Sequence, residues 1–264
     1  MKIRSKHISR HGNRRIVIID LAETITNQTS ANLFKLLGDI SLEAPPAGII
    51  LRITSLGGSL GAAQSIVESL DAVAAETGTL IYVVVEQSAI SAAFFVAVSG
   101  YKVFATGAAN IGAVGAVTHR YNIQDLLGRL GIRSATIMSG DEKTAYDRII
   151  ACDAEAASPS VNALVAETFQ QFIEHIAARR HLPREALSDL GDGRVISGRQ
   201  ALALGLIDHL GGIHAGIAAM ITEAGLVAPE IEYVTPTAPD GLVGQIAERL
   251  PLGFFWKWLF KGWR

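Results

Sequence analysis

The sequence predicts an α/β domain with a mainly parallel sheet, followed by a mostly helical second half. Strand-sized apolar runs alternate with segments of helical periodicity through the first 117 residues. The run Leu80–Val85 is apolar throughout, which is typical of a parallel strand covered on both faces. The chain has 264 residues, 49% hydrophobic and 18% charged, so it can bury the core of one large α/β domain or two small ones.

The first half alternates strands and helices, and each is recognised by a local signal. β-branched runs mark the strands, while capping residues and apolar side chains three or four apart mark the helices. Pro45 and Pro46 close the first strand–helix unit, and Ile66, Leu70 and Val73 form one helix face. In chain order we expect a strand at 16–20, a helix capped by Thr29 and Ser30 and running through Ile40, a strand at 48–53, a helix at 59–76, a strand at 80–85, a helix at 91–98, and strands at 101–105 and 111–117.

The second half is expected to be mostly helical. A long helix should span about 154–180, with Phe172, Ile173 and Ile176 on its apolar side. Shorter helices are expected at 123–130, from Leu182 onward, and at 198–204. Three prolines between 229 and 240 indicate an extended segment. We therefore divide the chain into a domain at 1–225, an extended segment with a short helix at 226–250, and a tail at 251–264.

Composition excludes several classes of function. The formal charge of −2 gives no basic excess for nucleic acid. Cys152 is the single cysteine, so no intrachain disulfide or cysteine-rich metal site is expected, and we expect no cofactor. Met1–His7 is basic, but no apolar run of signal-peptide length follows it. We expect no signal peptide or transmembrane helix, and a cytoplasmic or peripheral membrane location.

Two segments with candidate functional residues follow neighbouring strands. Gly57 and Gly58 end the strand at 48–53, and Ser91 follows the strand at 80–85. Ligands of parallel sheets bind at the carboxyl ends of the strands, where both segments should lie. Alone, each has an ordinary alternative, because a glycine pair can be a tight turn and a serine can cap a helix.

A lysine further along the chain could act as the base that a catalytic serine needs. Serine is a weak nucleophile until a base removes its proton, and a lysine can be that base when burial lowers its pKa. Lys143 follows Ser139-Gly140-Asp141-Glu142, and its acidic neighbours are expected to face solvent. No histidine fits a triad, and we expect His119 and His175 at the surface. Ser91, Lys143 and the glycine turn are therefore the parts of a Ser-Lys hydrolase.

The chain resembles the signal peptide peptidase A family of Ser-Lys proteases, which have the Clp protease/crotonase-like fold. The resemblance covers about residues 16–212 and is closest to short, single-repeat members. The matching segments are Ser55–Gly58, Ser91–Phe95, Ala105–Gly115, Ser139–Lys143, Asp192–Ala201 and Gly205–Asp208.

The resemblance implies an endopeptidase that works by acyl transfer on signal peptides or other apolar or unfolded peptides. Ser91 would be the nucleophile and Lys143 the base. The backbone N–H groups of Gly58 and Ala92 would bind the oxyanion, with Gly57 supporting the turn. It also implies a ring-like homo-oligomer in which neighbouring subunits contribute serine and lysine to one site.

Four positions depart from the family pattern. Leu56 replaces a proline in the turn, and Ala92 and Ala93 replace glycines beside the nucleophile. Ala113 replaces a serine that orients the lysine in the family, which lowers the expected efficiency. Three alternatives therefore stay open: a crotonase-like acyl-thioester enzyme, an inactive scaffold that organises membranes, and a phage-type head-maturation protease.

The C-terminal segment Phe254–Arg264 contains all three tryptophans, interleaved with lysine and arginine. It is too short to span a bilayer, which takes about 20 apolar residues. Aromatic rings beside cations suit the headgroup interface, so we expect peripheral membrane contact. The alternatives are packing on its own domain or a neighbouring subunit, and occupation of the substrate groove.

Overall fold

The computed structural model describes residues 14–43, 45–119, 121–133, 135, 137–140, 143–145, 149–150 and 158–236. Cys152, Asp141 and Glu142 lie outside the described residues, as does the segment Phe254–Arg264.

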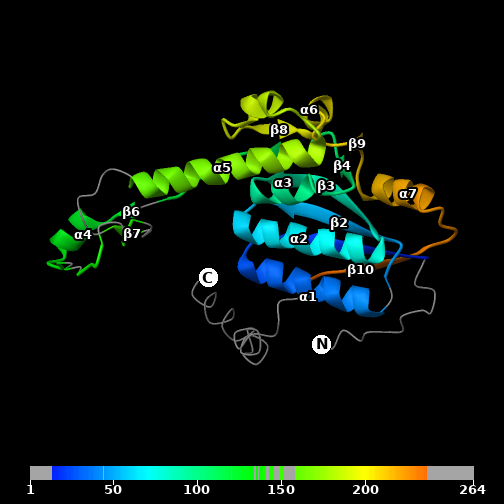
Figure 1. Ribbon diagram of the computed structural model, residues 1–264, viewed down its shortest axis with the longest axis horizontal. Coiled ribbons are helices and arrows are strands. Elements are labelled where there is room, and N and C mark those ends of the chain that lie inside the picture. Colours follow the sequence, from blue (N-terminus) through cyan, green and yellow to red (C-terminus); the bar gives the residue numbers. More distant parts are fainter. Residues whose placement is uncertain are drawn as a thin grey trace, which may run out of the picture.

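A mainly parallel sheet forms the centre of the fold (Figure 1). Its path runs β10–β1–β2–β3–β4–β9, and β5 and β8 continue from the end of β3. Among these described strands only the β5–β8 pair is antiparallel. The α/β prediction is therefore confirmed. The strands are β1 (Arg15–Leu21), β2 (Gly48–Ser55), β3 (Leu80–Ile90), β4 (Lys102–Ala105), β5 (Asn110–Gly112), β8 (Val195–Ser197), β9 (His209–Leu210) and β10 (Glu230–Val234).

Helices cover both faces of the sheet (Figure 1). Successive residues of β1 from Ile16 to Ile19 are 0% exposed although they point to opposite sides, which explains the uninterrupted apolar run. Helices α1, α2, α3 and α5 lie on one side and α7 on the other. Their bounds are α1 (Asn27–Glu43), α2 (Leu60–Thr77), α3 (Ala92–Ala97), α5 (Pro159–Arg180) and α7 (Ile213–Glu223).

The main differences from the predicted boundaries in the first half are at α1, β3 and β5. Helix α1 begins before Thr29, because the Thr29 amide donates to the hydroxyl of Thr26, 3.2 Å away, which makes Thr26 the capping residue. Strand β3 continues to Ile90. The strand expected at 111–117 ends at Gly112, because Gly112 and Ala113 have φ angles of 109° and 51°.

A small arm lies beyond the N-terminal end of α5 (Figure 1). It contains α4 (Gln124–Arg129) and a two-stranded ribbon of β6 (Tyr121–Asn122) and β7 (Ile149–Ile150). Helix α4 confirms the helix expected near 123–130, yet none of its residues is buried. Leu126 and Leu130 are 57% and 65% exposed, so the arm presents apolar side chains that its own chain leaves uncovered.

The remaining elements complete the sheet and its edge. The shorter helices expected in the second half are η2 (Arg184–Leu190), which is a 3-10 helix, and α6 (Gly198–Ala203). Strand β10 is extended, as expected for its segment, but pairs with β1, so the sheet continues past residue 225.

In the described part of the chain, no helix is both long and apolar enough to cross a membrane.

Candidate active site

Ser91 lies at a sharp turn between β3 and α3. Its φ and ψ angles are 52° and −124°, a conformation that costs a residue with a side chain about 1–3 kcal/mol. The turn is held because the Ser91 amide donates to Gly112 O at 2.7 Å, while Ser91 O accepts from the amide of Phe94 at 2.8 Å. The side chain makes no capping bond to α3. The ordinary alternative of a helix-capping serine therefore does not hold, and the hydroxyl is left for the cavity that Ser91 lines.

The Gly57–Gly58 turn lies directly against this serine. Gly57 has a φ angle of 96°, and a Cβ atom built on it would be 3.0 Å from Ser91 Cβ and 3.1 Å from the Ala92 nitrogen. It would also be 2.5 Å from Ile90 O, which no side chain tolerates. Only glycine permits this approach, so the two segments expected at neighbouring strand ends do meet.

The backbone around Gly58 directs one N–H group away from the protein core. Gly57 O accepts a hydrogen bond from the Ile25 amide at 2.9 Å, and the Ser59 amide donates to Ile25 O at 2.8 Å. In a trans peptide the N–H points opposite to the C=O. The Gly58 N–H therefore points away from Ile25, on the side where Gly58 lines the cavity. A Cβ at Gly58 would lie 2.1 Å from Ile25 O, so this residue must also be glycine.

Ala92 provides a second N–H group beside the serine. It is the first residue of α3, and the N–H groups of a first helical turn have no partner within the helix. Ala92 and Gly58 line the same cavity as Ser91. Two amides beside a hydroxyl are the arrangement that stabilises a tetrahedral oxyanion in acyl transfer.

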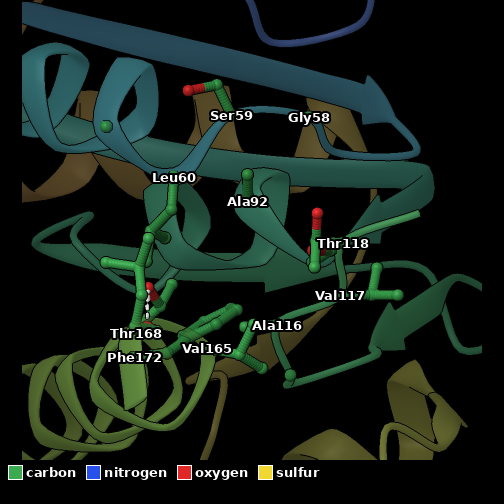
Figure 2. A pocket seen from close by; sticks show the side chains of 14 residues that line it. Gly58, Ser59, Leu60, Ala92, Ala116, Val117, Thr118, Val165, Thr168 and Phe172 are labelled. Atoms are coloured by element: carbon green, nitrogen blue, oxygen red, sulfur yellow. Dashed lines mark hydrogen bonds between the residues drawn. The ribbon is translucent and has the colours of Figure 1, made fainter. Parts of the chain in front are cut away.

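The cavity has a volume of about 460 Å³, and polar and apolar atoms contribute almost equally to its lining. Figure 2 shows Ala92 between the loop at Gly58 and the side chains of Val165 and Phe172 from α5. Thr118 and Thr168 place hydroxyl groups on its wall, and the Thr168 hydroxyl donates a hydrogen bond to Leu164 O at 2.7 Å. The described lining is Gly58, Ser59, Leu60, Gly61, Ser91, Ala92, Gly115, Ala116, Val117, Thr118, Leu164, Val165, Thr168 and Phe172.

Lys143 lies outside this group. It occupies a turn in which its amide donates to Gly140 O at 3.1 Å, and its side chain is exposed. It is not among the described residues that line the cavity. Within one chain, Ser91, Gly57, Gly58 and Ala92 therefore lie together, and this described group does not include the predicted base.

Ala113 follows the glycine whose carbonyl holds the Ser91 amide. Its own amide donates to Arg194 O at 2.9 Å, which fixes the residue in its left-handed conformation. A serine at this position would add a hydroxyl one residue after the glycine that holds the Ser91 amide, and alanine supplies none. The expectation that Ala113 lowers the efficiency of the dyad stays a prediction.

The expectation for His175 was wrong, whereas His119 is exposed as expected. His175 is half-buried, with its ring stacked on Phe95 at a centroid distance of 3.7 Å. Its Nε2 lies 3.0 Å from Phe95 O and 2.9 Å from the Ser99 hydroxyl. Burial lowers the pKa of His175 to about 4, so the ring is neutral and structural at ordinary pH.

The comparisons with known proteins agree with this geometry. The model of peptidase family S49 matches residues 74–227, more than half of the chain. The chain belongs to peptidase family S49. The Clp protease model also matches residues 5–124, so the S49 chain has the expected Clp protease-like domain.

Three relatives show how this S49 chain compares in length. It is 28% identical to a putative protease of Synechocystis over 88% of this chain and 83% of the relative. It is 26% identical to a putative signal peptide peptidase SppA of Enterococcus faecium over 89% and 72%. It is 26% identical to the chloroplastic serine protease SPPA of Arabidopsis thaliana over 74% of this chain but only 29% of that longer protein.

Two sequence segments typical of this family are structural here. A Cβ on Gly198 would lie 2.1 Å from Thr106 O, and Ser197 and Gln200 cap α6 reciprocally. Asp208 accepts two hydrogen bonds from Arg180, and the shorter is 2.7 Å. Asp208 also accepts the Val103 amide at 2.7 Å. Burial opposes ionisation, but these bonds outweigh it and hold the pKa of Asp208 below its usual value.

Proposed function

We propose that this S49 chain is a serine endopeptidase that uses Ser91 and Lys143 as a dyad. The observation that carries the proposal is the packing of Gly57 against Ser91 and Ala92, which places two backbone amides beside the nucleophile. Leu60, Val165 and Phe172 on the wall of the cavity beside Ser91 suit peptides with apolar side chains, such as signal peptides or unfolded segments.

The proposed reaction is acyl transfer in two steps. Ser91 Oγ bonds to the peptide carbonyl carbon as its proton passes to neutral Lys143 Nζ, and the oxyanion is bound by the N–H groups of Gly58 and Ala92. The C–N bond then breaks, and Lys143 returns the proton to the leaving amine. Water cleaves the ester by the same route and regenerates Ser91.

We propose that Lys143 comes from a neighbouring subunit of a homo-oligomer. Its exposure and its absence from the described lining of its own chain's cavity support this arrangement. The uncovered apolar side chains of the arm, Leu126 and Leu130 among them, suit a subunit contact. The catalytic site would then be complete only in the assembly.

Complementation tests the dyad and the subunit arrangement together. Ser91→Ala and Lys143→Ala should each abolish hydrolysis of a fluorogenic peptide, while light scattering shows the wild-type assembly. When the two inactive proteins are unfolded, mixed and refolded together, some interfaces pair an intact Ser91 with an intact Lys143. Activity should then return to a fraction of the wild-type rate.

A Lys143→Ala variant with near wild-type turnover would overturn the dyad. A mixture that stays inactive although both variants co-assemble would show that serine and lysine belong to one chain. Activity should also rise with pH, because only the neutral amine accepts a proton, and a flat profile contradicts a lysine base.

A catalytically weak or inactive S49 member that acts as a membrane-associated scaffold is the second candidate. The missing hydroxyl at Ala113 favours it. A fluorophosphonate probe separates the two functions, because it labels an activated Ser91 and leaves Ser91→Ala unlabelled. Absence of Ser91 labelling in the intact assembly would support the scaffold.

A further inference from the structure

Ser55, the last residue of β2, bonds to two separate stretches of backbone. Its side chain lies in a position that is only 3% exposed. The hydroxyl donates to Glu23 O at 2.6 Å and accepts the Gly57 amide at 3.2 Å. Leu56 between them is 77% exposed, so the residue inside the turn does not anchor it to the protein.

The stretch that receives the Ser55 hydroxyl is itself fixed. Thr29 in α1 is 2% exposed, and its hydroxyl donates to Thr24 O at 2.9 Å. The side chain of Ile25 is buried in the core. Residues Glu23 to Ile25 therefore form a rigid support, held by a helix N-terminus and a core side chain.

Two hydrogen bonds to this support determine the orientation of Gly57. Its N–H is bonded to the Ser55 hydroxyl, which Glu23 O holds in turn, and its C=O is bonded to the Ile25 amide. The bond from the N–H fixes the peptide plane that joins Leu56 to Gly57, and the bond to the C=O fixes the next plane, which joins Gly57 to Gly58. That plane carries the Gly58 N–H toward the cavity.

We propose that Ser55 is a positioning residue for the oxyanion site, and that its hydroxyl prevents rotation of the Gly57–Gly58 peptide. This inference rests on the proposed function, because it concerns the same amide that binds the oxyanion. Glycine at both positions leaves the turn free to adopt other φ and ψ angles, so a side-chain anchor is needed at its start. Loss of the Ser55 hydroxyl should weaken the stabilisation of the transition state and leave the binding of the ground-state peptide unchanged.

The test compares Ser55→Ala with Thr79→Val in the full-length protein. Thr79 is a matched control at the opposite end of the sheet: it is 4% exposed, and its hydroxyl donates to Pro46 O at 2.9 Å. Both variants remove a buried hydroxyl that bonds to a carbonyl more than thirty residues earlier. Both should lower the thermal midpoint to a similar extent.

Only Ser55→Ala should change catalysis. With a fluorogenic peptide that has leucine before the scissile bond, kcat should fall about 10- to 100-fold with KM within about twofold of wild type. The matching peptide aldehyde forms a tetrahedral adduct with Ser91 whose oxygen needs the oxyanion amides. Its affinity should fall in parallel with kcat, while the affinity of the peptide acid stays unchanged.

The outcomes separate this inference from the proposed function. A wild type without Ser91-dependent cleavage overturns both. An active wild type with equal kcat in Ser55→Ala and Thr79→Val overturns the inference alone, as does a rise in KM at constant kcat. If Ser55→Ala does not assemble, Ser55→Cys decides, because it nearly preserves the volume and weakens both hydrogen bonds.

Discussion

The amide of Ser91 donates a hydrogen bond to the carbonyl of Gly112 at 2.7 Å, which ties the nucleophile to the residue before Ala113. The contact joins the end of β3 to the end of β5, whose strands pair up to Ile90 and Gly112. A change at position 113 is therefore made on backbone already fixed to the serine.

Ala113→Ser should raise peptidase activity by about two- to tenfold, since one neutral hydrogen bond contributes about 0.5–1.5 kcal/mol. The new hydroxyl would be placed to orient the lysine base. Steady-state kcat with a fluorogenic peptide measures the effect, and Ala108→Ser at an exposed position is the control. Unchanged or reduced activity in Ala113→Ser would show that another group already orients the lysine.

Gly57→Ala should abolish hydrolysis and destabilise the fold by about 2 kcal/mol or more, because a residue with a side chain is strained at positive φ. The added methyl group would lie 2.5 Å from Ile90 O, so the turn must move away from Ser91. Urea unfolding at one fixed protein concentration measures the loss of stability.

Gly38→Ala is the control for the effect of glycine replacement alone. Gly38 lies within α1, and a Cβ there would meet nothing within 4 Å. This change should stabilise the protein by about 0.5–1 kcal/mol and leave kcat unchanged. Retained hydrolysis in Gly57→Ala would contradict the proposed contact between turn and nucleophile.

Acid should destabilise the protein through His175. The folded state keeps this ring neutral down to a pKa of about 4, whereas the unfolded chain binds a proton near the ordinary value of 6.5. The contribution is therefore fully present above pH 6.5 and is lost as pH falls from 6.5 to 4. The loss should be on the order of 2 kcal/mol, allowing for the ring's partial contact with solvent.

Urea unfolding of wild type and His175→Gln at several pH values measures this contribution. The variant should lose less free energy of unfolding between pH 6.5 and 4, because it has no group to titrate there. His119→Gln, changed at an exposed ring, should follow the wild type. Parallel pH curves for wild type and His175→Gln would contradict the assignment of a neutral, buried ring.

The sequence predicted the parts of the site that depend on local order along the chain. Gly57, Gly58 and Ser91 each follow an apolar run, and parallel strands bring their carboxyl ends to one edge. The role of Ser55 was missed because its partner Glu23 lies 32 residues earlier. His175 was misplaced for the same reason, since Phe95 and Ser99 come from the α3 region about 80 residues away.

Backbone conformation set a second limit on prediction from sequence. The strand expected to continue to residue 117 ends early because Ala113 adopts a positive φ, which alanine rarely does. The hydrogen bond from its amide to Arg194 O supports that conformation, and Arg194 lies in a segment far along the chain. No local signal at Ala113 indicates this bond.

The last prediction concerns the C-terminal segment Phe254–Arg264, for which we propose peripheral membrane contact. Its tryptophans at 256, 258 and 263 alternate with cationic residues, a composition suited to the boundary between headgroups and acyl chains. The full-length protein should sediment with vesicles that contain anionic lipid, and a chain ending at Pro251 should remain in the supernatant with its thermal midpoint unchanged.

Replacing the three tryptophans with serine keeps the length and charge of the segment and should remove most of the binding, because cations alone are screened by salt. Equal sedimentation of the full and shortened chains would refute membrane contact. A rise in peptidase activity on shortening, without any change in sedimentation, would instead indicate that the segment occupies the substrate groove.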